Sequence, residues 1–387
     1  MSRVKLISIG YAVPEYWYTQ EEAFNILGYP RVWWRIFRDS GIDKRHFVIK
    51  LSDAVKMSFQ EQQDLYRGKA VDLSVEAIKN CLDGRDIKAI KRMIYGSCTG
   101  FAPGPTIPHF LSARLGFSPD TYIINNSGMG CEAAFPGLKT AYDYVKANGG
   151  QALAVNCELS SLAYWPEREN PDDVTCRPDP ENGFEVLRSN ALFADAAIAA
   201  LIGDDDDWRH PEIIDTENNT NTEYLDDLGF EWRNGRLRVI LSRRVPELAA
   251  QVVKPAVWAV LKRNGLDIWD ITWWVIHAAG GSVIDNIGKA LSLPEEKLAL
   301  SRETLRLYGN TSSTSVGITG KLLMDENIQP GDYVAMLSVG PGMSGGATLL
   351  RFGDKPKEAI VGILTEKERI GLADFERRRL NLQGATV

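Results

Sequence analysis

The chain is poor in the residues that build disulfide frameworks, metal sites and phosphate-binding loops. It has five cysteines, an odd and scattered set without a CxxC pair, which argues against disulfides and a zinc site. No P-loop motif is present, and no glycine-rich turn has the context of a dinucleotide-binding fingerprint. No apolar run reaches spanning length, and the N-terminal one is too short for a signal peptide. We therefore expect a cytoplasmic protein with no bound metal or cofactor and no membrane association.

Basic residues are fewer than acidic ones. Lys and Arg number 44 against 51 Asp and Glu, which gives a net charge of −7. This balance argues against broad binding of nucleic acid or of an anionic membrane, although a local basic patch around a ligand mouth stays open. The 44% of hydrophobic residues is typical of a soluble globular protein, and 387 residues suffice for one large domain or two medium ones.

Short β-type runs alternate with helical patterns along the whole chain. This alternation predicts an α/β layered fold. The expected strands lie near 91–100, 121–128, 151–160, 191–203, 272–280 and 332–342, and the expected helices near 71–83, 106–115, 131–147, 248–264 and 313–326.

The two parts of the chain show a weak internal echo. In each, a polar turn opens a helix and a glycine-containing link leads into an apolar strand, which suggests two related halves. Two segments, 166–188 and 204–226, are rich in charge and are expected to be surface insertions. The tail from 354 has the pattern of a charged amphipathic helix, either packed on the surface or engaged with a partner.

Cys131 stands at the mouth of the helix expected over 131–147, directly after the flexible run "SGMG". A helix N-terminus stabilises a thiolate, so we expect a lowered thiol pKa here. Cysteine is also among the most buried residue types, and this stretch alone leaves nucleophile and core thiol both open.

A nucleophilic cysteine usually needs a histidine, and the chain has four. His277 differs from the others because it ends the apolar run "ITWWVIHAAGG", where α/β folds place functional groups. Asn310 in "YGNTSS" is either a helix cap or an amide donor to an oxyanion. Gly340 and Gly342 flank a tight turn after a strand and are expected to form a backbone wall beside a substrate.

Together, these motifs resemble those of the type III polyketide synthases, the chalcone synthase-like family. "GMGCEAAFPGLKTAYDYV" resembles the nucleophile motif, "NALFADAAIAALIG" the LFGDGAAA strand, and "VIHAAGGSV" the HxGG segment with one extra alanine. "YGNTSS", "SVGPGMSGG" and "SGIDKRHFVI" resemble three further family segments, in family order. The run "GSCTGFAPG" is more similar to bacterial members, including those that make dihydroxyphenylacetyl-CoA from malonyl-CoA.

The resemblance implies a homodimer with a thiolase-like αβαβα fold built from two related halves, 1–215 and 216–353, followed by an extension over 354–387. It implies that Cys131 carries the starter acyl group, and that His277 and Asn310 stabilise the enolate formed when malonyl-CoA loses CO₂. Phe193 and Val239 would form a gate. The same resemblance assigns cavity-lining positions to Cys98, Ser160, Ala163 and Ser312, and CoA phosphate contacts to Lys44 and Arg45.

The expected function is therefore that of an acyltransferase, which condenses an acyl-CoA starter with malonyl-CoA by decarboxylative Claisen condensation. The alternative is a ketoacyl synthase III-like enzyme that performs one condensation or acyl transfer, with a carrier protein possible as the substrate donor. A carrier-dependent enzyme should show a basic patch at the tunnel mouth. A non-catalytic subunit is a third class, and its expected sign, a lost nucleophile, is absent because Cys131 is present.

Overall fold

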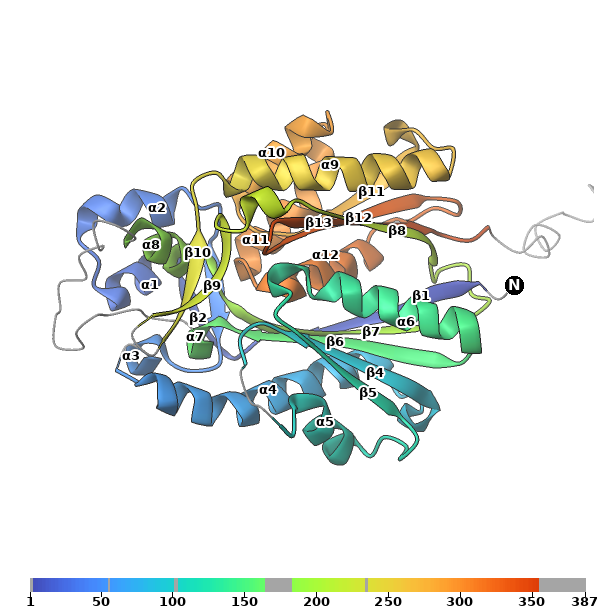
Figure 1. Cartoon of the computed structure of the whole chain (residues 1–387), viewed down its shortest axis with the longest axis horizontal. Coiled ribbons are helices and arrows are strands. Elements are labelled where there is room, and N and C mark those ends of the chain that lie inside the picture. Colours follow the sequence, from blue (N-terminus) through green and yellow to red (C-terminus); the bar gives the residue numbers. More distant parts are fainter. Residues whose placement is uncertain (1–2, 55, 101–103, 164–182, 234–235, 355–387) are drawn as a thin grey trace, which may run out of the picture.

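The computed structural model describes residues 3–54, 56–100, 104–163, 183–233 and 236–354. Figure 1 shows five layers, in which two sheets enclose one layer of helices and each sheet is covered on its outer face by further helices. This is the predicted αβαβα arrangement. Hydrogen-bonded pairing runs through nine strands in the order β11-β12-β13-β8-β1-β7-β6-β4-β5. Between β8 and β1 the pairing is limited to Glu212 and Lys5, and there the two halves of the sheet diverge into separate layers.

The two halves share most of their order of elements, except that α11 of the second half stands where the first half has β5. The first half contains β1 (Val4–Ala12), α4 (Phe59–Leu82), β4 (Ile90–Ser97), α5 (Ile107–Leu115), β5 (Tyr122–Ser127), α6 (Ala134–Asn148), β6 (Gln151–Leu159) and β7 (Asp195–Asp204). The second half contains β8 (Glu212–Thr220), α9 (Val245–Arg263), β11 (Ile271–Ile276), α10 (Gly281–Ala290), α11 (Ala299–Tyr308), α12 (Ser315–Met324), β12 (Tyr333–Gly340) and β13 (Ser344–Arg351). The two related halves are thus visible in the fold, while their exact boundaries stay a prediction.

The layers follow from which faces of each element are apolar. In β7, Ile198 and Ile202 face the central helices α6 and α12, whereas Ala199 and Leu201 face the outer helices α4 and α5. A strand buried on both faces has no polar side, as its sequence shows. The side chains that recur at helical spacing along one face of α6, including Leu138 and Val145, are buried.

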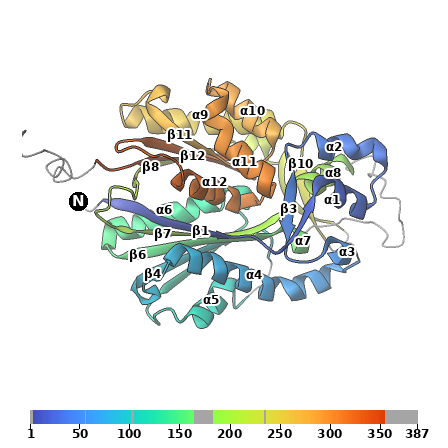
Figure 2. The ribbon, with the colours of Figure 1, turned by 180° about the vertical axis from the view of Figure 1, so that it is seen from behind.

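One end of the layered body carries a group of short elements. They are β2 (Tyr16–Thr19), α1 (Gln20–Leu27), α2 (Trp34–Arg38), β3 (Lys44–Phe47), α3 (Leu51–Ala54), α7 (Ser160–Ala163), α8 (Gly183–Leu192), β9 (Leu228–Arg233) and β10 (Arg236–Leu241). Figures 1 and 2 show them gathered at the end opposite the N-terminus. The β9–β10 hairpin and α8 from this group contribute to the site described below.

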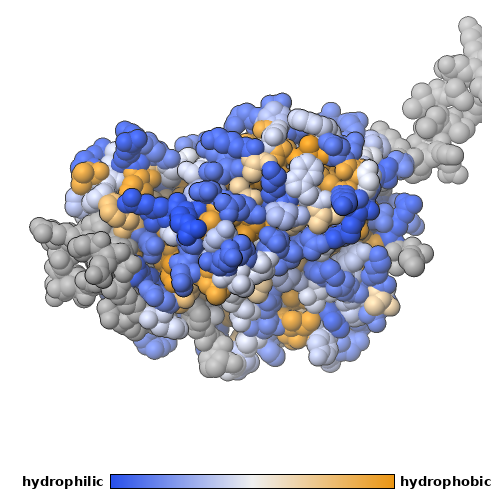
Figure 3. Space-filling model, turned by 45° about the horizontal axis from the view of Figure 1, so that its top comes forward, coloured by the Kyte–Doolittle hydropathy of each residue, from blue (hydrophilic) through white to orange (hydrophobic). Residues whose placement is uncertain are grey.

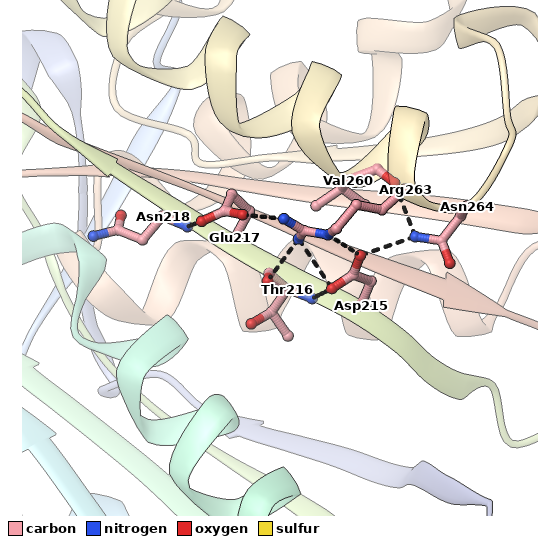
Figure 4. A network of polar contacts seen from close by, with 7 residues as sticks. All are labelled: Asp215, Thr216, Glu217, Asn218, Val260, Arg263 and Asn264. Carbon is pink, nitrogen blue, oxygen red and sulfur yellow. Dashed lines mark hydrogen bonds and ion pairs between the residues drawn. The ribbon is translucent and has the colours of Figure 1, made fainter.

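The expectation that 204–226 is a surface insertion is wrong, because Glu212–Thr220 forms β8 and pairs along its length with β13. Its acidic side chains are neutralised from the end of α9, as Figure 4 shows. Arg263 Nε donates to Asp215 Oδ2 at 2.9 Å, its guanidinium also binds Glu217, and Asn264 Nδ2 donates to Asp215 at 2.9 Å. Because composition alone does not reveal such a cation, the segment looked unsuited to a sheet.

Two other predicted segments fall largely outside the described residues. Most of 166–188 lies there, but 183–188 begins α8, whose Leu187 is fully buried, so this part is not a surface loop. The tail after 354 lies outside as well. In the part of the chain that is described, no helix combines the length and apolarity needed to cross a membrane. With the α9–α10 layer turned forward, hydrophobic side chains form scattered patches among hydrophilic ones (Figure 3).

Candidate active site

Cys131, Phe193, His277 and Asn310 line one cavity of about 320 Å³, here called the Cys131 cavity. Each arrives from a different element: a 3-10 turn at Gly130–Glu132, the residue after α8, the end of β11, and the turn after α11. Residues predicted from separate motifs therefore meet at one place, although up to 179 positions separate them in the chain.

Cys131 is buried, and its Sγ accepts a hydrogen bond from Ser312 Oγ at 3.4 Å. Burial raises the pKa of the Cys131 thiol to about 12, and the carboxyl groups of Glu158 and Glu132 act in the same direction. The predicted lowering of this pKa is wrong. Helix α6 begins only at Ala134, so its N-terminal field is set against desolvation and two acidic neighbours.

His277 is held from two sides. Its backbone N–H donates to Leu337 O at 2.9 Å, and its Nδ1 forms a short hydrogen bond with Ser315 Oγ. The same Ser315 Oγ accepts from the N–H of Ala278 at 3.2 Å. Burial lowers the pKa of His277 to about 4, so the ring is neutral near pH 7. No hydrogen bond joins His277 to Cys131 within the described residues.

Asn310 and Phe193 are fixed to each other through their backbones. The N–H of Asn310 donates to Leu192 O and the N–H of Ala194 donates to Asn310 O, both at 2.9 Å. The Asn310 side chain donates to Ala279 O at 3.0 Å and accepts from the N–H of Ser312 at 2.8 Å. The amide is thus both part of the turn, as a cap would be, and exposed to the cavity.

A second cavity, of about 530 Å³, lies beyond Ser312 and is called here the Cys98 cavity. It is lined by Cys98, Trp232, Leu237 and Pro341, among others. Ser312 Oγ lies 3.7 Å from Cys98 Sγ, so one hydroxyl contacts the cysteines of both cavities. The buried carboxyl of Glu158 accepts from the Cys98 N–H at 3.1 Å and from Ser313 Oγ at 2.6 Å, which closes this polar cluster.

The other predicted pocket residues have different surroundings. Val239 is buried in the same hydrophobic cluster as Phe193 and Cys131 but lines neither cavity. Ser160 donates to Ala194 O at 3.1 Å, which supports the strand after Phe193. Ala163 ends α7, and its side chain lies outside the description. The roles of these residues in substrate binding stay predictions.

The two glycines of the β12–β13 turn differ. Gly340 is packed beneath the Cys131 turn, where an added Cβ would lie 2.6 Å from Glu132 Cβ, so it does not form a cavity wall. Gly342 has a φ of 101° and donates to Leu228 O at 3.4 Å, which places this turn against the β9–β10 hairpin. Neighbouring Val339 and Pro341 are the residues of this segment that reach the cavities.

The structure places the predicted CoA contacts away from the cavity. Arg45 is fully buried, and its guanidinium donates to Asn190 O and Phe193 O, each at 2.8 Å. Burial lowers the pKa of Arg45 to about 9. This position argues against contact with a CoA phosphate, and it makes Arg45 a support for the gate residue. Lys44 Nζ lies 5.6 Å from the ring centre of Trp17 on the β2–β3 sheet.

Sequence reasoning missed the arginines that do line the Cys131 cavity, Arg188 and Arg243. Arg188 donates to Leu241 O at 2.6 Å, and its buried Nε has no hydrogen-bond partner among the described residues. Arg243 lies over the Phe184 ring, 5.1 Å from its centre. No cluster of His, Cys, Asp or Glu that could hold a metal occurs in the described ranges.

Comparison with known proteins agrees with this geometry. Residues 48–206 match the family model of chalcone and stilbene synthases, N-terminal domain, and residues 261–352 match that of 3-oxoacyl-(acyl-carrier-protein) synthase III, C terminal. The 1,3,6,8-tetrahydroxynaphthalene synthase of Streptomyces coelicolor is 26% identical over 86% of this chain and 88% of its own length. The 3,5-dihydroxyphenylacetyl-CoA synthase of Streptomyces toyocaensis is 27% identical over 88% of each.

The fold comparison points the same way. The crystal structure of the Streptomyces coelicolor 1,3,6,8-tetrahydroxynaphthalene synthase covers 90% of this chain and 99% of its own, with a TM-score of 0.79 at 24% identity. The fold is therefore that of the thiolase-like condensing enzymes, and the similarity to named polyketide synthases makes the chain an acyltransferase. Within this class it belongs to the type III polyketide synthases of the bacterial type.

Proposed function

We propose that the enzyme loads a starter acyl group onto Cys131 and extends it with malonyl-CoA, with His277 and Asn310 acting on both steps. The observation that carries this proposal is that Cys131, His277, Asn310 and Phe193 line a single cavity. Membership of the type III polyketide synthases supports decarboxylative condensation with CoA thioesters as substrates.

Cys131 and His277 are both uncharged near pH 7, so loading must begin with a proton transfer from the thiol to the imidazole. In the loading reaction, the thiol gives its proton to His277 Nε2 as its sulfur attacks the carbonyl of the starter thioester. The CoA thiolate then leaves and takes that proton. A neutral imidazole can accept this proton, whereas an imidazolium could not, so the lowered pKa of His277 suits the role of a base.

Extension needs hydrogen-bond donors in place of a base. Loss of CO₂ from malonyl-CoA leaves an enolate, whose oxygen is stabilised by N–H groups of His277 and Asn310, and whose carbon attacks the acyl-cysteine. Ser315 supports both steps, because a serine hydroxyl either donates to Nδ1 or accepts from it and so accompanies either ring tautomer.

We assign the two cavities to different parts of the substrate. The Cys131 cavity, which is lined by Arg188 and Arg243, would admit the phosphopantetheine arm. The larger Cys98 cavity, lined by Trp232 and Leu237, would hold the growing chain. Replacing Arg188 by Ala should raise the KM for acyl-CoA, while Arg244→Ala should not, because Arg244 pairs with Asp227 at 3.2 Å and does not line the cavity.

The alternative is a single ketoacyl synthase III-like condensation from a carrier protein, which would need positive charge near the substrate entrance. The net negative charge of the chain does not count against it. Among the described residues, Arg188 and Arg243 line the Cys131 cavity beside a single acidic residue, Asp39, so positive charge is in excess there even though the chain is acidic overall. Similarity to named polyketide synthases over most of the chain favours repeated condensation from CoA thioesters. Arg188→Ala would weaken carrier-borne and CoA-borne substrates alike, so only direct comparison of the two donors separates them.

We further propose a homodimer, no resident cofactor and a cytoplasmic location. The dimer is supported by β5, one of the two edge strands, which pairs only with β4 among the described residues and exposes 63% of Tyr122. Such an open edge commonly pairs with another chain. Light scattering on the purified protein would show twice the mass of the 43.0 kDa chain, and a monomer would reject the dimer.

Mass spectrometry of the products tests the proposed function directly. The enzyme is incubated with malonyl-CoA, alone and with a panel of acyl-CoA starters and the corresponding carrier-bound starters. We expect polyketides that contain two or more malonyl-derived units. Products with a single added unit, formed only from the carrier-bound starters, would favour the alternative instead.

A further inference from the structure

Glu132, the residue after Cys131, is buried without a cation. Its side chain is 1% exposed, and no Lys, Arg or His of the described residues forms an ion pair with it. An ionised carboxylate is costly in such a place unless it is paired or fully hydrogen-bonded. The side chain therefore needs a physical explanation that the acyl-transfer mechanism does not supply.

The β12–β13 hairpin is shaped around this carboxyl group. Ser344 Oγ forms a short hydrogen bond with Glu132 Oε2. A Cβ on Gly340 would lie 2.6 Å from Glu132 Cβ, and a Cβ on Gly346 would lie 3.0 Å from Oε1. Because these two glycines have no side chain, they leave the space that the Glu132 side chain fills.

The hydrogen bonds of Ser344 indicate whether Glu132 is protonated or ionised. Ser344 Oγ lies near two oxygens, Glu132 Oε2 and the carbonyl oxygen of Pro341 at 3.3 Å. A carbonyl only accepts, and so does a carboxylate, but the serine has one hydrogen to donate. Protonated Glu132 resolves this, because it donates to Ser344, which then donates to Pro341. Burial also raises the pKa of Glu132, to about 7.

The hairpin that receives Glu132 also holds the catalytic histidine. Leu337, on β12, accepts the backbone N–H of His277 at 2.9 Å, and Gly340, at the end of the same strand, packs against Glu132. The Cys131 turn and His277 are therefore aligned by one common strand. A loose Glu132 would let the two reacting groups drift apart.

We propose that Glu132 is a positioning residue that works as an uncharged acid: it fastens the Cys131 turn to the β12–β13 hairpin and keeps negative charge away from the thiol. The proposal rests on Cys131 being the nucleophile. The other ionisable groups around this pair are Glu158 from β6, Cys98 after β4, and four residues that line the Cys131 cavity, namely His277, Asp39, Arg188 and Arg243. None of them changes in the variants below.

The test is the rate at which iodoacetamide alkylates Cys131, measured by peptide mass spectrometry from pH 5.5 to 9 in the full chain and in Glu132→Gln. The amide keeps the donor to Ser344 and cannot ionise. We expect similar alkylation rates below pH 6. At pH 8 to 9 the Glu132→Gln rate should be several-fold above that of wild type, because only in wild type does residue 132 ionise and place a carboxylate beside the Cys131 thiolate. A rate ratio that does not change with pH would overturn the proposal.

Ser344→Ala provides a second, independent test. When Glu132 ionises, Ser344 can turn its hydrogen from Pro341 O to the carboxylate, and this hydrogen bond to a charged acceptor is the stronger of the two. Loss of the hydroxyl should therefore move the inflection in the alkylation profile to higher pH. An inflection that stays in place would also overturn the proposal. Glu132→Gln should keep condensation within about twofold of wild type at pH 6.5, whereas Glu132→Ala should lower kcat more than tenfold; equal losses in both would leave no role for the acid group. Since alkylation needs no polyketide to form, a failure here is distinguishable from failure of the proposed function.

Discussion

The hydroxyl of Ser312 lies 3.4 Å from Sγ of Cys131 and donates a side-chain hydrogen bond to this thiol. It opposes the desolvation that otherwise makes the thiolate costly. A hydroxyl from the other half of the chain, together with a backbone hydrogen bond at Cys131 itself, thus favours the thiolate of Cys131.

Replacing Ser312 by Ala should slow alkylation of Cys131 by about tenfold at pH 8, since a hydrogen bond to a charged group contributes about 1.5 kcal/mol. The measurement is the iodoacetamide rate by peptide mass spectrometry. Ser189→Ala is the matched control, because that buried hydroxyl bonds within α8 at 2.8 Å and lines neither cavity. Equal rates in Ser312→Ala and wild type would show that the contact has no effect on the thiol.

His277→Ala and Asn310→Ala should each lose malonyl-CoA decarboxylation, because each removes a donor to the enolate oxygen. Loss of one such donor typically costs 10²- to 10³-fold in rate. The release of CO₂ from labelled malonyl-CoA measures this step without a starter. Cys131 should still react with iodoacetamide in both variants, and undiminished CO₂ release would remove these residues from the oxyanion site.

The neutral His277 also predicts how stability changes with pH. Its pKa is about 4 in the fold, below the 6.5 of a free histidine, so between these values the unfolded chain binds the extra proton. The contribution is fully present above pH 6.5 and is lost as pH falls toward 4, by roughly 3 kcal/mol at 1.36 kcal/mol per pKa unit. Urea unfolding of wild type and His277→Gln at pH 5 and 7 isolates this contribution. When the pH falls from 7 to 5, the free energy of unfolding should drop more in wild type than in His277→Gln.

A larger side chain at Val239 tests the predicted gate between Val239 and Phe193. Its neighbours two positions away, Leu237 and Leu241, line the Cys98 and Cys131 cavities, so Val239→Phe should press both cavities inward. We expect shorter products by mass spectrometry and a loss of about 1–3 kcal/mol from overpacking. Ile240→Phe, on the other face of β10, is the control. An unaltered product profile in Val239→Phe would separate this residue from the substrate path.

Local motifs predicted that Cys131, His277 and Asn310 belong to one site, and the three residues line one cavity, while their roles stay predictions. Cys131 and Asn310 follow turns after β5 and α11, and His277 stands directly after β11. Such turns are encoded by neighbouring residues. The layers could be predicted for the same reason, because apolar runs of strand length alternate with helical ones.

What could not be predicted depends on contacts between distant segments. Glu132 and Ser344 are 212 positions apart, and only the packing of β12 and β13 on the Cys131 turn brings them together. Arg45 was expected to contact a CoA phosphate, yet the carbonyls of Asn190 and Phe193 hold it in the interior. The lowered thiol pKa was expected from the helix alone, without the burial that outweighs it.

The central claim is that Cys131 carries the growing acyl chain. Intact-protein mass spectrometry after brief exposure to an accepted acyl-CoA, followed by peptide mapping, tests it most directly. The account predicts one added acyl mass on the peptide that contains Cys131, and none in Cys131→Ala, which should also form no polyketide. An acyl adduct on another residue, or condensation that persists in Cys131→Ala, would contradict it.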